Sequence, residues 1–174
     1  MTKKAWATVL FLGIVCPLSA GAEDSLVKFK GGIGVIPVSS AAGALNADGT
    51  SPNVNRNVVR GVNPPGQIWV IADLRADVKT DGRIKVRGRG LLLGGGNGIG
   101  TNANQSVRAT LICEAAAPFT LRDTGLVPLE VNGDFRIDDV LTAPADCASP
   151  VLLIRNPAGA WFAAGIVNRR SDDD

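Results

Sequence analysis

The stretch DLRADVKTDGRIKVRGR, residues 73–89, gives the clearest indication of the fold class. Two runs in which charged and apolar residues alternate flank the turn-forming triplet Thr80-Asp81-Gly82, a pattern typical of a β-hairpin. A two-residue loop, Asp81-Gly82, would bring charged side chains of one strand beside apolar side chains of the other, because strand side chains alternate between the two faces. A three-residue loop removes this conflict and places Gly82 at the left-handed position that such loops require.

The three-residue loop also fixes the register of the hairpin. It pairs Lys79 with Arg83, Asp77 with Lys85, Arg75 with Arg87 and Asp73 with Arg89. The apolar residues between these positions then share the opposite face, which predicts one buried and one exposed side. Because two of the four basic residues on the second strand face aspartates, we interpret the charged side as a solvated, partly neutralised surface and not as an anion-binding stripe.

Short runs rich in branched and apolar residues recur between residues 67 and 167. They are QIWVIADLRADVK, RIKVRGRGLLL, VRATLICEA, LVPLEV, FRIDDVL, PVLLIR and AWFAAGIV. None has an apolar stripe at helical spacing, so the sequence predicts an all-β fold, a single antiparallel β-sandwich or barrel-like domain. The last two runs alternate little, which predicts central strands covered on both faces, with Trp161 and Phe162 in the core.

Two further turns are expected in this region. The motif VNGD predicts a loop of Asn132–Asp134 that would pair Val131 with Phe135. The motif NPAG, residues 156–159, places Pro157 at the second position of a turn between the last two strands.

The chain divides into four expected segments. Residues 1–22 have two lysines, a short apolar run and a small-residue site ending at Ala22, which predict a signal peptide cleaved near Ala22 and a secreted or periplasmic product. Residues 23–66 are expected to form an N-terminal strand and a loop-rich arm, residues 67–167 the antiparallel β core, and residues 168–174 an acidic tail. No apolar run approaches the about 20 residues that a membrane-spanning helix needs.

The charge balance bears on the choice of partner. The formal net charge of +2 belongs to the precursor, since residues 1–22 include Lys3, Lys4 and no acidic residue. A neutral mature chain argues against nucleic acid or anionic membranes as partners, where net positive charge supplies much of the affinity. The chain also has no tyrosine, which weakens the case for aromatic stacking surfaces.

The chain has no histidine, which excludes Ser-His-Asp and Cys-His nucleophile systems and His-ligated zinc. Carboxylate chemistry remains, and the best candidate is the acidic cluster Asp134, Asp138 and Asp139, with Glu130 nearby. These carboxylates are either a solvated strand end, a glycan-hydrolysing acid and base, or ligands of calcium. No stretch satisfies the EF-hand pattern, and we predict no catalytic residue, metal or cofactor.

Cys113 and Cys147 remain after residues 1–22 are removed. An even pair in an exported chain predicts a disulfide, and the alternation of VRATLICE directs Cys113 into the core.

The glycine-rich run LLLGGGNGIGT, residues 91–101, invites a phosphate-loop interpretation. It matches neither the dinucleotide-binding fingerprint nor the P-loop, and a strand instead of a helix is expected after it. We therefore predict a flexible crossover loop. Whether its backbone amides at 94–100 face solvent or a partner is left open by the sequence.

Several segments together resemble a group of small exported bacterial proteins of unassigned function. The segments are GGIGVIPVSS, NVVRGVNPPGQIWVI, DGRIKVRGRGLLL, GIGTNANQSVRATLIC, GDFRIDDVL, DCASPVLLIR and AWFAAGI. The resemblance spans about Lys30 to Ile166 and implies a signal peptide, a single β-rich domain and a cysteine pair matching Cys113 and Cys147. It implies no catalytic residue, ligand or cofactor.

These observations favour an exported, non-enzymatic structural or interaction module whose loops contact an extracellular or periplasmic protein or glycan. The alternatives are a carboxylate-based glycan hydrolase that uses Asp134, Asp138 and Asp139, and a lectin-like or calcium-dependent binding protein.

Overall fold

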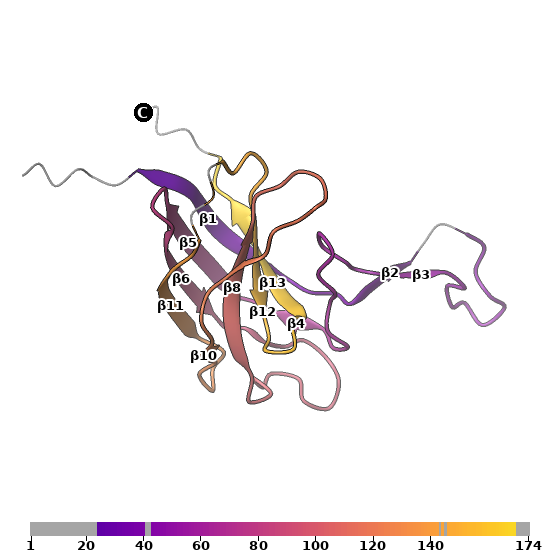
Figure 1. Ribbon diagram of the computed structural model, residues 1–174. Helices are drawn as coiled ribbons and strands as arrows, with labels where there is room; N and C mark the ends of the chain where they lie inside the picture. Colours follow the sequence, from indigo (N-terminus) through magenta and orange to yellow (C-terminus); the bar gives the residue numbers. More distant parts are fainter. Residues whose placement is uncertain (1–23, 41–42, 143, 145, 170–174) are drawn as a thin grey trace, which may run out of the picture.

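The computed structural model describes residues 24–40, 43–142, 144 and 146–169, and every regular element among them is a β-strand (Figure 1). The predicted signal peptide and residues 170–174 of the predicted tail lie outside these residues. The strands are β1 (Ser25–Gly34), β2 (Val38–Ser40), β3 (Val54–Arg56), β4 (Trp69–Val70), β5 (Asp73–Lys79), β6 (Arg83–Arg89), β7 (Leu92–Leu93), β8 (Ser106–Ile112), β9 (Arg122–Asp123), β10 (Val127–Pro128), β11 (Phe135–Val140), β12 (Val151–Arg155) and β13 (Trp161–Val167). No helix in the described ranges has the length and apolarity needed to cross a membrane.

The main sheet has nine strands and is antiparallel throughout. Its strand order is β10-β8-β12-β13-β1-β5-β6-β11, and β9 pairs with β8 beside β10. The sheet curls on itself into a half-barrel (Figure 1). The predicted all-β antiparallel class is therefore confirmed, and of the two architectures expected from the sequence the barrel-like one is observed.

The core lies on the concave side of the curled sheet. Alternate residues of β5 and β6 point into it, and Leu74, Val78 and Ile84 are 0% exposed. The run Leu152–Ile154 of β12 is buried without alternation, as predicted for a central strand. Trp161 and Phe162 are buried core residues, so their predicted placement is confirmed.

The register predicted for the first hairpin is confirmed. Asp73 pairs with Arg89, Arg75 with Arg87, and Asp77 with Lys85. Gly82 has a φ of 91° and its amide donates to the carbonyl of Lys79 at 3.0 Å. A left-handed conformation of this kind favours glycine because it has no Cβ.

The turn predicted for NPAG is also confirmed. The amide of Gly159 donates to the carbonyl of Asn156 at 3.0 Å, and that of Asn156 to the carbonyl of Ala160 at 2.9 Å. Pro157 occupies the second position of this turn, and β12 and β13 pair on either side of it.

The pairing predicted around VNGD is wrong. The chain does reverse there, since the amide of Glu130 donates to the carbonyl of Asp134 at 2.9 Å. However, β10 pairs with β8, while β11 pairs with β6 and places Phe135 opposite Gly88. The turn therefore connects β10 with β11, the first and last strands of the order. The curl of the sheet allows one short turn to connect these two strands.

The N-terminal region contributes directly to the sheet. β1 lies between β13 and β5 in the middle of the strand order. Within the segment expected to be a loop-rich arm, β2 and β3 form a separate two-stranded ribbon that extends away from the main sheet (Figure 1). Val54 in this ribbon is 59% exposed, which explains why no apolar period marks it in the sequence.

The predicted disulfide between Cys113 and Cys147 is confirmed. It joins the end of β8 to the loop before β12, and the amide of Ser149 donates to the carbonyl of Cys113 at 3.1 Å. The guanidinium of Arg60 donates to the carbonyl and the Oγ of Ser149, both at 2.7 Å, and to the carbonyl of Glu114. One arginine thus connects the segment after β3 to both sides of the bridge.

Removal of the disulfide in the C113A/C147A variant should lower the free energy of unfolding by about 3 kcal/mol, because the covalent loop restricts the unfolded chain. Urea denaturation monitored by tryptophan fluorescence measures this difference against the unsubstituted protein without reductant. A change below about 0.5 kcal/mol, the range of ordinary surface substitutions, would contradict the stabilising role.

Gly88 permits the close approach of a phenyl ring. A Cβ built on Gly88 would lie 2.0 Å from Cε1 of Phe135, its cross-strand partner in β11. The ring, 2% exposed, covers the glycine on the core side.

Gly88→Ala should therefore destabilise the fold by about 1–3 kcal/mol through overpacking, as measured by urea denaturation. Gly66→Ala is the matched control, since a Cβ there meets nothing within 4 Å. Equal stability of the two variants would show that Phe135 does not occupy this position.

Candidate functional site

The exposed face of β1, β5, β6 and β11 carries many charged side chains. Each strand alternates apolar residues toward the core with polar residues toward solvent, as in the exposed-and-buried pattern of Arg83–Arg89. Residues directly opposite in an antiparallel pair project from the same face. The registers of the three strand pairs therefore determine which charges become neighbours.

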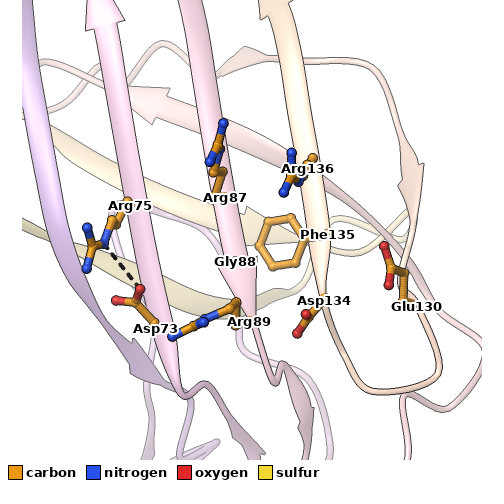
Figure 2. Close-up of a pocket in the computed structure, with 9 residues that line it drawn as sticks. All are labelled: Asp73, Arg75, Arg87, Gly88, Arg89, Glu130, Asp134, Phe135 and Arg136. Atoms are coloured by element: carbon orange, nitrogen blue, oxygen red, sulfur yellow. Dashed lines mark hydrogen bonds and ion pairs between the residues drawn. The ribbon is translucent and has the colours of Figure 1, made fainter.

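Those registers align four cations in one line. Lys30 pairs with Arg75, Arg75 with Arg87, and Arg87 with Arg136. We call these four residues the cationic row. Figure 2 shows Arg75, Arg87 and Arg136 coming from three neighbouring strands at the same level of the sheet.

Like charges directly opposite one another destabilise a sheet, and the row offers little internal compensation. Among the described residues, Arg75 alone of the four has a carboxylate partner, Asp73, whose Oδ2 lies 3.2 Å from the arginine Nε. In the part of the chain that the structure describes, no hydrogen bond or ion pair involves the side chains of Lys30, Arg87 or Arg136. Their charged groups are thus available to a ligand.

The flanking positions on the same face have the opposite character. Two residues along each strand, Lys28 pairs with Asp77, Asp77 with Lys85, and Lys85 with Asp138, so that charges alternate in sign. Nζ of Lys85 lies 3.5 Å from Oδ2 of Asp138. On the other side of the row, Asp73 pairs with Arg89, and Asp134 lies beside Arg89 (Figure 2).

Two hollows adjoin the row. The larger, of about 500 Å³, is lined by the charged residues Arg75, Arg87, Arg89, Arg136, Asp73, Glu130 and Asp134, and by Gly88 and the 2% exposed Phe135. The smaller, of about 290 Å³, includes Lys28, Lys30 and Lys85 and shares Arg75 and Arg87 with the larger one. The row thus runs along a surface with space on both sides for a bound molecule.

The acidic residues singled out in the sequence have separate structural roles. Asp134 links the segment before β11 to the end of β6, its Oδ1 accepting from the amide of Gly90 at 3.0 Å. Asp138 pairs with Lys85 on the exposed face. Asp134 and Glu130 line the larger hollow, while Asp138 and Asp139 do not.

Asp139 is held by backbone donors. Its Oδ2 accepts from the amide of Gly125 at 2.7 Å and its Oδ1 from the amide of Val140 at 2.8 Å. These two hydrogen bonds, the one from Gly125 above all, lower the pKa of Asp139, because they favour the charged carboxylate. Among the described residues no group of three or more carboxylates or cysteines is arranged to hold a metal ion.

Among the described carboxylates, that of Glu114 has the largest shift in pKa. Glu114 follows Cys113 of the disulfide and does not belong to the cationic row. Its Oε1 accepts from Nη2 of Arg122 at 3.0 Å. This hydrogen bond has the largest effect on the pKa of Glu114, and backbone hydrogen bonds of Glu114 and Thr120 come next. Together they lower the pKa of Glu114 to about 2. The pair contributes to the surface of the fold and not to the candidate site.

The glycine-rich loop is largely satisfied internally. The amide of Gly94 donates to the carbonyl of Ile68 at 2.9 Å, and that of Gly100 to the carbonyl of Leu93 at 2.9 Å. The amide of Ile99 donates to the carbonyl of Gly96 at 3.2 Å. Part of the backbone at residues 94–100, which the sequence does not assign to solvent or to a partner, therefore makes hydrogen bonds within the protein.

Two of the four residues of the cationic row, Arg75 and Arg87, are predicted as neighbours from the sequence. The hairpin register placed Arg75 opposite Arg87, but the neighbours Lys30 and Arg136 come from strands distant in sequence. The alternation of KFK in β1 and of FRID in β11 was the available signal. It assigns a face to each residue but does not say which strands are adjacent.

Comparison with known proteins gives no relative: no family model, curated protein or solved structure matches this chain. A single β-rich domain with one disulfide is what the structure establishes.

Relief of the charge repulsion should be measurable in the absence of ligand. Arg87→Gln should raise the free energy of unfolding at low salt by about 0.2–1 kcal/mol, because it removes like-charge contacts on both sides, and the gain should shrink as salt screens the charges. Lys85→Gln is the control and should not stabilise, since Lys85 lies between two aspartates. Urea titrations at several salt concentrations measure both effects, and destabilisation by Arg87→Gln at low salt would contradict the account.

Proposed function

We propose that the protein is an exported, non-enzymatic binding module that holds anionic groups on the cationic row. The observation that carries the proposal is the alignment of four cations, Lys30, Arg75, Arg87 and Arg136, on four adjacent strands. Among the described residues one carboxylate, Asp73, pairs with the row, through Arg75. Residues that reduce stability are retained where they serve binding. Arginine suits this role because its planar donor fork matches carboxylate, sulfate and phosphate groups.

The position of the row on regular strands also supports binding. Groups held on paired strands are placed more precisely than groups on loops. Beneath the row, the core side of β6 is fixed by the packing of Phe135 over Gly88. The proposal differs from the expectations drawn from sequence alone in two ways: it assigns the contacts to the sheet face instead of the loops, and it makes part of the charged face an anion site, where the sequence favours a solvated surface. Export rests on the predicted signal peptide of residues 1–22.

Stabilisation by a simple anion tests the proposal. Sodium sulfate should raise the melting temperature above the value in sodium chloride of equal ionic strength, by roughly 2–4 °C for each kcal/mol of binding free energy. Sulfate also stabilises proteins generally through exclusion from their surface. The decisive quantity is therefore the excess over an R87Q/R136Q variant, and the R83Q variant, changed on the same strand outside both hollows, should keep that excess. An equal response of all three proteins would overturn the proposal.

A further inference from the structure

We infer that the ligand of the cationic row is a single linear chain of acidic polysaccharide, with one carboxylate or sulfate group on each sugar. This inference rests on the proposed function and specifies the ligand class for the same site. Three features of the row carry it: its spacing, its width and the lack of exposed aromatic rings beside it, since Phe135 and Phe29, which border the hollows, are each 2% exposed.

The spacing favours an extended ligand. The row runs across the strands with one cation on each, and neighbouring strands lie about 4.8 Å apart. Four cations therefore extend over about 14 Å, which a single sulfate or phosphate ion cannot span. In a polyuronate, successive charges are separated by one pyranose ring, a length comparable with the strand spacing. Phosphates in polyphosphate share a bridging oxygen and are more closely spaced than the cations of the row.

The width favours a single chain. Flanking positions lie about 7 Å away along the strands and include Asp77 and Asp138 on one side and Asp73 on the other. A second file of anions would face these carboxylates as well as Lys28, Lys85 and Arg89, and so would meet mixed charge instead of cations alone. A nucleic-acid duplex or an anionic membrane presents a broad array of negative groups, whereas one polysaccharide strand keeps its charges above the row.

The chemistry of the face favours a ligand that needs no stacking. The two phenylalanines of these strands, Phe29 and Phe135, point into the core and are each 2% exposed. Proteins that bind single-stranded nucleic acid stack bases on exposed aromatic rings, and this face has none among its described residues. The guanidinium groups of Arg75, Arg87 and Arg136 can instead donate paired hydrogen bonds to carboxylate or sulfate oxygens.

Isothermal titration calorimetry with di-, tetra- and octagalacturonate tests the inference. Affinity should be higher for the tetramer than for the dimer, because more cations of the row are engaged. The octamer should bind each site no more tightly than the tetramer. Arg87→Gln and Arg136→Gln should each weaken tetramer binding about tenfold, the loss expected for one charge-assisted contact. Arg83→Gln, on the same strand and face but outside both hollows, should change it by less than about twofold, and neutral dextran should not bind.

The outcomes separate this inference from the proposed function. Equal affinity for dimer and tetramer, with the sulfate effect intact, would overturn the extended ligand and leave anion binding standing. Tighter, Arg87-dependent binding of polyphosphate, an oligodeoxynucleotide or phosphatidylglycerol vesicles than of tetragalacturonate would overturn the polysaccharide assignment alone. Loss of both the sulfate effect and galacturonate binding would remove both proposals.

Discussion

The cross-strand register of β6 is the constraint on which the rest of the structure depends. It places Ile84 and Val86 in the core and their neighbours Lys85 and Arg87 on the convex face. Because β5 and β11 pair with β6 in matching registers, a shift of one residue would exchange the two faces of the hairpin. The same register that builds the core therefore aligns the arginines outside it.

The hairpin and the disulfide were predictable because their signals are local or compositional. The triplet Thr80-Asp81-Gly82 specifies a loop length, and alternation on either side permits one register. The pairing of Cys113 with Cys147 follows because these two of the three cysteines lie outside the predicted signal peptide. The same reasoning gave the wrong partners around Asn132–Asp134, where the turn is real but joins strands at opposite ends of the sheet order. Turn chemistry fixes a chain reversal, whereas long-range packing fixes the neighbours.

The candidate site shows why net charge is a poor guide to local electrostatics. The neutral net charge expected after removal of the predicted signal peptide argues against anionic partners, yet acids and bases are segregated on the convex face into a row of one sign between rows of mixed sign. Lys30 and Arg136 complete that row from residues distant in sequence from the hairpin. Composition cannot show this segregation, because it arises only when four strands become adjacent.

The most direct measurement follows the arginine side chains themselves. In a two-dimensional ¹⁵N NMR titration with tetragalacturonate, the Nε–Hε resonances of Arg75, Arg87 and Arg136 should shift together and saturate at one ligand per protein. Arg83 lies on the same strand as Arg87, and its Nε is 2.7 Å from Oδ2 of Asp81. The Nε–Hε resonance of Arg83 should not shift with the other three. Shifts confined to other sites, such as the backbone amides of residues 94–104, with these three arginines unperturbed, would contradict a binding site on the cationic row.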